Sequence, residues 1–384
     1  MKNKINFMAL GGGQQIGASS YFINVDGCNI LLDCGCGMSD GLTYGPNLNG
    51  ILSFVNSFSE VDAVFISHSH YDHIGYLPQF HAMAPNVPIY ATTQTKILAN
   101  HLIWDTGRRY EKYKKKSVIT REELLAENAL SSIITVGYST KMSFPKFDIT
   151  FYEAGHIPGA AMILIETDNN KILYTGDFAK ANTPLSEGYI LPNDVSADTL
   201  ILCGVHAACP EFTHHFSAKS LIRRLNGSLS KDITVLNVRQ LTKGLEMARL
   251  LNDAMEQSLI PERSIFIDDD IWRLSERLET MGCYVFGRQC RPFPEASFKN
   301  GIYITESGAL GQYYEAERVD FSLHATYPEI KELIQKINPK SVLIVHTGNS
   351  EENINRHRIE LDMNNEADSK SVFIYPENNE IYNI

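Results

Sequence analysis

The chain has 384 residues, of which 43% are hydrophobic and 21% charged, and its formal net charge is −11. This composition is typical of a folded protein, and the length allows two domains or one domain with an insertion. The acidic balance excludes a surface coated with positive charge for non-specific nucleic-acid binding, and no apolar run reaches the roughly 18 residues of a transmembrane helix.

The N-terminus and the cysteines indicate the compartment. Residues 1–10 include basic side chains, but the apolar segment before Gly11 is too short for a signal peptide. The seven cysteines form no CxxC pair, and the closest two are Cys34 and Cys36. We therefore expect a cytoplasmic protein with reduced thiols and no disulfide or zinc role for its cysteines.

The first third of the chain predicts strands followed by βα units. Residues 5–10 form an expected strand, and an Asp26-Gly27 turn joins two more strands at 20–25 and 28–33. The glycine-rich turn at 11–17 lacks the Lys-Ser/Thr pair of a P-loop and precedes strands rather than a helix, which disfavours a phosphate loop.

A short apolar strand at 64–66 leads into a histidine-rich segment at 67–75. Further along, residues 95–130 are expected to be mainly helical. The remaining elements expected in this region are a loop and helix over 42–58, a helix over 74–83 and a strand at 88–91.

The helical region carries a basic run at 108–116, where six of nine residues are Lys or Arg and two are Tyr. Such a run can neutralise phosphates while the tyrosines stack on bases. A solvated helix face explains the same residues equally well, and the sequence leaves both interpretations open.

The second half of the chain changes from strands to alternating strands and helices. Strands are expected at 133–136, 149–152, 161–166 and 171–174. From about 205 to 320, strands at 233–236, 264–267 and 301–304 alternate with helices at 243–257 and 271–281. This βαβ rhythm predicts a small parallel-sheet domain, inserted rather than tethered, since no linker or repeat is evident.

The pattern HxHxDH places His68, His70, Asp72 and His73 in the loop that leaves the expected strand at 64–66. Open α/β sheets usually place their chemistry at this end of a strand. The spacing offers ligands in two directions, which suits a pair of metal ions, and imidazole and carboxylate are ligands that zinc takes. Two metals about 3.5–4 Å apart can clamp both oxygens of a displacement.

Four ligands leave two metals under-coordinated, so more are expected at other strand ends. His156 follows the strand at 149–152, Asp177 follows the strand at 171–174, and His346 ends an apolar run. One such histidine alone is usually a core residue, but three in this order favour metal ligation. An aspartate between the metals can bridge them.

These motifs, HxHxDH, then AGHIPGA at 154–160, then YTGDF at 174–178, then a late strand-end histidine, resemble the metallo-β-lactamase superfamily. The segments 13–20 and 321–346 are similar to its β-CASP branch, which includes the pre-mRNA 3′-end cleavage endonuclease and RNase J. The resemblance implies an α/β fold, an αββα sandwich with an inserted β-CASP-like domain. It implies a sandwich formed by residues 1–204 and 321–384, with residues 205–320 inserted.

Carried over by position, the resemblance implies two zinc ions, with manganese as an alternative. The ligands would be His68, His70 and His156 for one ion, Asp72, His73 and His346 for the other, and Asp177 as the bridge. A metal-bridging hydroxide would attack phosphorus, with Asp72 and Asp177 at the reacting centre. His324 would protonate the leaving oxygen as general acid.

The substrate side departs from the family pattern. The usual carboxylates that support His324 are replaced by Cys203 and Thr326, and nearby His206 or Glu211 could substitute for them. Lys243 stands where the family has an arginine, which keeps the charge but loses the bidentate fork. The residues expected to bind substrate are Lys243, Ser307 and Gly308.

The sequence therefore predicts a metal-dependent phosphodiesterase or nuclease, with RNA rather than DNA as the expected substrate. Two alternatives stay open. One is a dinuclear hydrolase of a small phosphodiester or ester, and the other is a catalytically weak β-CASP-like subunit that positions a partner. Since no further nucleic-acid-binding domain is evident, we expect a homodimer or a protein partner to supply substrate grip.

Overall fold

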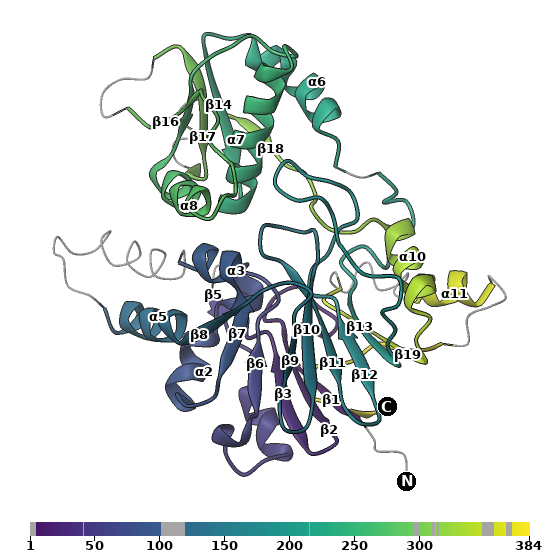
Figure 1. Ribbon diagram of the computed structural model, residues 1–384. Coiled ribbons are helices and arrows are strands. Elements are labelled where there is room, and N and C mark those ends of the chain that lie inside the picture. The colour runs from purple at the N-terminus through teal and green to yellow at the C-terminus, as the bar shows by residue number, and fades with distance from the viewer. Residues whose placement is uncertain are drawn as a thin grey trace. The chain divides into compact units, whose positions relative to one another are not determined.

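The computed structural model, drawn in Figure 1, describes all residues except 1–4, 41, 101–119, 215, 295–298, 309–311, 313–314, 348–356 and 366–370. The basic run at 108–116 lies outside the described residues, so both interpretations of it stay predictions. Among the helices that are described, none combines the length and the apolar character that crossing a membrane requires.

The chain folds into two compact units. The first consists of Met1–Lys180, Tyr189–His214 and His324–Ile384, and the second of Ala181–Gly188 and His215–Leu323. The α/β class expected from the sequence is confirmed. The proposed division at residues 204 and 320 stays a prediction of domain organisation.

The described part of the first unit contains two seven-stranded sheets. In spatial order, the first sheet is β21 (Ile381–Asn383), β1 (Asn6–Gly11), β2 (Ser20–Val25), β3 (Cys28–Leu32), β6 (Ala63–Phe65), β7 (Ile89–Thr92) and β8 (Ile133–Val136). The second is β20 (Val372–Ile374), β19 (Ser341–Val345), β13 (Thr199–Cys203), β12 (Lys171–Tyr174), β11 (Ala161–Glu166), β10 (Asp148–Glu153) and β9 (Lys141–Ser143). A separate hairpin pairs β4 (Gly37–Ser39) with β5 (Leu42–Tyr44).

The two sheets pack face to face because each presents apolar side chains to the other. Phe7 and Phe65 of the first sheet share a core with Phe151 and Ile172 of the second. Successive side chains of a strand point to opposite faces, and Met8 accordingly belongs to a second core on the outer face of the first sheet. This outer core is covered by η1 (Leu48–Ser53), α2 (Leu77–Met83) and α5 (Arg121–Ser132).

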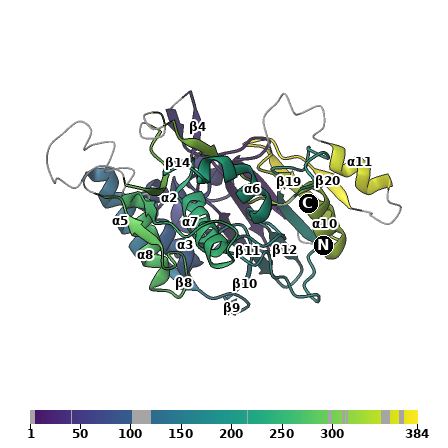
Figure 2. The same cartoon turned by 90° about the horizontal axis from the view of Figure 1, so that it is seen from above.

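The second sheet is accompanied by α10 (Tyr327–Ile337) and α11 (Arg358–Asn365), and α10 lies near β19 in both views (Figures 1 and 2). The helix buries Ile330, Leu333 and Ile337 at helical spacing, which is the pattern of a helix with one apolar face. The first unit thus has four layers in space, in the order helices, sheet, sheet and helices.

Two local expectations need correction. The helix expected within 42–58 is instead β5 followed by the short 3₁₀ helices η1 and η2 (Phe58–Glu60), because Gly45, Pro46 and Gly50 interrupt a regular α-helix. The single helix expected over 74–83 is split into α1 (Tyr71–Ile74) and α2. The remaining helix in the described part of this region is α3 (Thr93–Leu98).

The second unit has an all-parallel sheet of five strands within its described residues, as the βαβ rhythm predicted. The helix α7 (Leu241–Glu256) packs on three strands of this sheet and on the helix α8 (Asp269–Glu279). The elements are α6 (Ala218–Leu229), β14 (Ile233–Val238), α7 (Leu241–Glu256), β15 (Ile265–Ile267), α8 (Asp269–Glu279), β16 (Cys290–Pro292), β17 (Gly301–Thr305) and β18 (Glu317–Val319).

A buried carboxyl ties the segment Ala181–Gly188 to the second unit. Glu246 of α7 is 1% exposed, and it accepts hydrogen bonds from the Thr183 hydroxyl at 3.0 Å and the Leu185 amide at 3.1 Å. Burial raises the pKa of Glu246 to about 8, although both hydrogen bonds act in the opposite direction. In the unfolded chain the pKa is roughly 4.3.

This raised pKa predicts that the protein loses stability as the pH rises toward and through 8. Between the two pKa values the folded state keeps a proton that the unfolded state releases. In Glu246→Gln the amide oxygen can accept from Leu185 while the NH₂ group donates to Thr183, so the charge is removed and both contacts remain. We expect the variant to be more stable than the wild type at pH 9 by on the order of a few kcal/mol, and similar at pH 5.

Denaturant unfolding at pH 5 and pH 9 measures this effect. The matched control is Glu256→Gln, at an exposed position of the same helix, which should not change the pH dependence. If the wild type and Glu246→Gln lose stability in parallel as the pH rises, the buried carboxyl does not cause the loss.

Candidate metal centre

The histidine-rich loop connects β6 to the short helix α1. The amides of His73 and Ile74 donate to the His70 carbonyl at 2.9 and 3.0 Å, which closes the first turn of the helix. The chain before this turn is extended, since His70 is the N-cap residue with φ −64° and ψ 146°. Because the backbone changes from extended to helical after His70, His68 and His70 can point in a different direction from Asp72 and His73.

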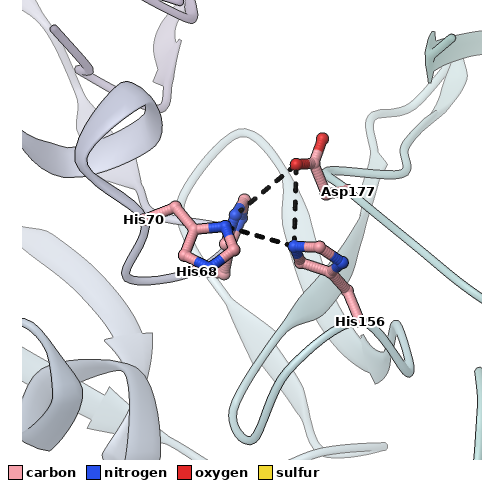
Figure 3. Close-up of side chains that lie close together, drawn as sticks. All are labelled: His68, His70, His156 and Asp177. Carbon is pink, nitrogen blue, oxygen red and sulfur yellow. Dashed lines mark hydrogen bonds and ion pairs between the residues drawn. The ribbon is translucent and has the colours of Figure 1, made fainter. Parts of the chain in front are cut away.

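Four side chains form the first group, with ligand atoms that all lie within 4.8 Å of one another. Figure 3 shows His68, His70, His156 and Asp177 pointing toward one another from three separate loops. His70 Nδ1 and His156 Nε2 are 3.2 Å apart, and Asp177 Oδ2 lies 3.7 Å from both His68 Nε2 and His156 Nε2. The loops follow β6, β10 and β12, whose carboxyl ends share one edge of the sandwich.

Asp72, His73 and His346 form the second group, in which His346 Nε2 lies 3.6 Å from Asp72 Oδ2. The carboxylate of Asp177 reaches this group too: Oδ2 is 3.6 Å from His73 Nε2, and Oδ1 is 3.8 Å from His346 Nε2. All seven residues expected as ligands therefore lie together. Asp177 is placed between the two groups, as a bridging ligand would be.

Three buried atoms of these groups test whether a cation fits. His68 Nε2, His73 Nε2 and Asp177 Oδ1 have no hydrogen-bond partner among the described residues. Leaving a buried polar atom unpaired typically costs about 1–3 kcal/mol, so three at one place need an explanation. Two imidazole nitrogens and a carboxylate oxygen are donor atoms that divalent metals accept. The residues present fit a metal site.

Burial and mutual charges set the electrostatics of the cluster. Burial raises the pKa of the Asp177 carboxyl to about 7, against the lowering effect of His73. For His73 itself, burial lowers the pKa, but Asp177 and Asp33 outweigh it and raise the value to about 9. Burial and the neighbouring imidazoles hold the pKa of His68 and His346 well below 6.5. Both rings are thus neutral at pH 7, the form in which imidazole binds metals.

Asp33 is a site residue that sequence reasoning did not single out. It follows β3, is fully buried, and accepts from the Ser67 amide at 2.6 Å and from the Tyr174 hydroxyl at 2.6 Å. Its Oδ2 also lies 2.8 Å from His73 Nδ1, which directs His73 Nε2 toward the cluster. The available signal was a carboxylate ending an apolar strand, the same pattern that marked Asp177.

Ser19 plays the matching role on the other side of the cluster. Its hydroxyl lies 2.8 Å from His346 Nδ1, which leaves Nε2 of that ring facing the ligand group. His346 also adopts a left-handed backbone conformation, with φ 54°, and its amide donates to the Gly12 carbonyl at 2.7 Å. A strained conformation held by its surroundings is typical of functional sites.

We expect Asp33→Asn to weaken metal binding by about 10- to 100-fold, because residues that orient metal-bound histidines contribute on this scale. The affinity is measured by competition with a chelator of known strength. Asp62→Asn is the matched control, since Asp62 also accepts a backbone amide, that of Asn29 at 2.7 Å, but touches none of the seven ligands. Equal affinities for the wild type and Asp33→Asn would contradict the orienting role.

The expected general acid, His324, lies beside the cluster just before α10. Its Nδ1 is 3.5 Å from Asp177 Oδ2, its ring centroid is 4.5 Å from that of His156, and its side chain is 27% exposed. Burial, followed by the surrounding imidazoles, lowers its pKa well below 6.5. The distances and the exposed fraction together show that the side chain contacts both the ligand group and solvent.

The two positions that lack the family's carboxylates are occupied differently. Cys203, the last residue of β13, is 4% exposed and donates to the Tyr174 hydroxyl at 3.7 Å. Thr326 is the N-cap residue of α10, and both its amide and its hydroxyl donate to Glu329, at 2.7 and 3.0 Å. Thr326 thus serves the start of the helix.

The three residues expected to bind substrate belong to the second unit. Lys243 is in the first turn of α7, where its Nζ lies 2.9 Å from Asp320 Oδ1. Ser307 and Gly308 follow β17, and the Ser307 carbonyl accepts from the Asn237 side chain at 3.2 Å. These positions lie at the carboxyl edge of a parallel sheet, where ligands commonly bind, and their role stays a prediction.

Two family models match the chain. A metallo-beta-lactamase superfamily domain matches residues 3–193, and a Zn-dependent metallo-hydrolase RNA specificity domain matches residues 313–351. A crystal structure of a protein of unknown function from Enterococcus faecalis V583 superimposes with a TM-score of 0.62 at 16% identity, covering 100% of both chains. At this identity the likeness concerns the fold alone.

Curated relatives share parts of the sequence. Probable RNase MJ4 of Methanocaldococcus jannaschii is 36% identical over 179 residues, 46% of this chain and 40% of the relative. Endoribonuclease ysh-1 of Neurospora crassa is 29% identical over 242 residues, 61% of this chain and 27% of the relative. Integrator complex subunit 11 of Danio rerio is 32% identical over 178 residues, 45% and 29% of the two chains. The chain thus matches less than half the length of each.

Proposed function

The chain belongs to the β-CASP branch of the metallo-β-lactamase superfamily, and from this membership we propose that it is a metal-dependent nuclease that cleaves RNA. The position of Asp177 between two ligand groups is the observation that carries the proposal. A single buried carboxylate with contacts of 3.6–3.8 Å to histidines of both groups has the placement that a two-metal hydrolase needs.

The proposed ligands would hold two zinc ions, with manganese as the alternative for the same donor atoms. Bound metal ions supply Lewis acidity and lower the pKa of water, which is the chemistry that hydrolysis of a phosphodiester needs. Asp33 and Ser19 fix the ring orientation of His73 and His346. The ligand residues are His68, His70, Asp72, His73, His156, Asp177 and His346.

His324 is the proposed proton donor to the leaving oxygen. It borders the ligand group through Asp177 and His156 and keeps 27% of its side chain exposed, so a substrate phosphate at the cluster can reach it. Donating a proton to a leaving oxygen contributes about 10²- to 10⁴-fold in rate. The carboxylates of Asp72 and Asp177 accept hydrogen bonds but cannot donate them when ionised, so they favour a cation at the cluster.

Two observations support RNA as the substrate. The RNA specificity model covers residues 313–351, which include His324 and His346. Two of the relatives carry names of ribonucleases. A homodimer or a protein partner that supplies substrate grip remains part of the proposal.

Cleavage of end-labelled single-stranded RNA by the metal-loaded protein tests the function, with single-stranded DNA and bis(p-nitrophenyl) phosphate alongside. We expect RNA to be cleaved fastest and His70→Ala to lose both metal and activity. The control His357→Gln, at an exposed position just before α11, should match the wild type in metal content and activity. Turnover of the small diester alone would mean that the substrate is a small phosphodiester and not RNA. Metal binding without any turnover would indicate a subunit that positions a partner.

A further inference from the structure

The proposed proton donor has no carboxylate at either of the two positions where the resemblance implies one. Of the two positions where a carboxylate would support His324, one is the thiol of Cys203 and the other is Thr326, whose donors are directed at Glu329. A different side chain, His206, packs against His324 instead, with ring centroids 6.1 Å apart.

The backbone that carries His206 is held by a series of tight turns after β13. The Gly204 amide donates to the Val345 carbonyl at 2.8 Å, and the Ala207 amide donates back to Gly204 at 3.0 Å. The His206 carbonyl accepts from the Cys209 amide at 3.0 Å. A side chain at Gly204 would approach Ile344 to 2.7 Å, so the absence of a Cβ there lets the turn lie directly on β19.

The ring of His206 is fixed as well. It stacks on Phe212 with a centroid distance of 3.6 Å and an interplanar angle of 20°. Phe212 is itself tied to the segment that carries His324, because its carbonyl accepts from the Tyr327 amide at 3.0 Å. Next to His324 in the chain, the Ala325 amide donates to the carbonyl of Phe178, the residue after Asp177, at 2.6 Å.

The ring of His324 has two other imidazoles beside it. His156 approaches it at 4.5 Å with a tilt of 37°, and His206 meets it edge to face at 81°. Edge-to-face contacts between rings at 4.5–7 Å are favourable and directional. We propose that His206 is a positioning residue that holds the His324 ring in the orientation needed to protonate the leaving oxygen, in place of the family's carboxylate.

The charge state of His206 agrees with this role. Burial lowers its pKa to about 4, although Glu211 acts in the opposite direction. His206 is therefore neutral at pH 7 and places no charge beside the His324 ring. Glu211, the other side chain that could replace a carboxylate beside His324, is exposed, and it acts to raise the pKa of His206.

The inference rests on the proposed nuclease function, and substrates with different leaving groups separate the two. Cleaving RNA expels a ribose oxygen that needs a proton, whereas p-nitrophenolate leaves without one. We expect His206→Gln to reduce kcat on RNA about 10-fold or more, within the range that general-acid catalysis contributes, with KM and bound metal unchanged. Turnover of bis(p-nitrophenyl) phosphate should stay within about twofold, since this substrate bypasses proton donation.

Two further variants make the test sharper. Phe212→Leu, which removes the stacking surface, should show the same selective loss on RNA, and His357→Gln should show none. The double variant His206→Gln/His324→Ala should be no slower on RNA than His324→Ala, because residues that act as one unit are not additive. Equal losses on both substrates, or additive losses in the double variant, would overturn the proposal. If the wild type cleaves neither substrate, the nuclease function fails and this inference falls with it.

Discussion

The Asp177→Asn variant is expected to lose metal and RNA cleavage together. The substitution keeps the shape of the side chain but removes the charge that faces His68, His73 and His156 at 3.6–3.7 Å. Because one carboxylate serves both ligand groups, its loss disturbs both metal positions at once. We expect cleavage to fall at least about 10²-fold, a typical loss for one group that stabilises developing charge.

Metal analysis beside a cleavage assay measures both losses in the same preparation. Asp148→Asn is the matched control, because Asp148 begins β10 at the edge of the sheet away from the cluster and pairs with Lys141 at 2.8 Å. Unfolding of the metal-free proteins checks that all variants fold. Full metal content in Asp177→Asn would show that the carboxylate does not bridge the two groups.

The His324→Ala variant should separate chemistry from metal binding. His324 touches the cluster but belongs to neither ligand group, so metal content should match that of the wild type. We expect RNA cleavage to fall about 10²- to 10⁴-fold, the usual contribution of a general acid. The small diester should be turned over nearly as fast as by the wild type, since its leaving group needs no proton.

Single-turnover rates on the two substrates give the comparison. A parallel loss on RNA and on bis(p-nitrophenyl) phosphate would mean that His324 supports the cluster rather than the leaving group. A loss of metal in this variant would assign His324 to the ligands. Either result would remove proton donation from the account.

Much of the candidate site could be predicted because its residues mark the ends of apolar strands. His68 and Asp177 follow β6 and β12, and His346 follows β19. Since β12 and β19 run parallel through β13, their carboxyl ends reach the same edge of that sheet, which brings Asp177 and His346 close together. The residue types and their positions at strand ends were sufficient to name these candidate ligands.

The residues that sequence reasoning missed depend on contacts between distant segments. Asp33 orients His73 across 40 positions of sequence, and nothing in the local pattern shows which side chain a carboxylate will meet. The pairing of His206 with Phe212 depends on the turns that bring their rings together. The attachment of Ala181–Gly188 to the second unit depends on Glu246, a charged residue that pattern alone would place on a surface.

Titration of metal-free protein with zinc, while RNA cleavage is followed, tests the central claim most directly. Two ligand groups that share Asp177 predict that cleavage is absent without metal, rises with added zinc and levels off near two equivalents per chain. Cleavage that needs no metal, or saturation of the metal sites without any cleavage of RNA, would contradict the account.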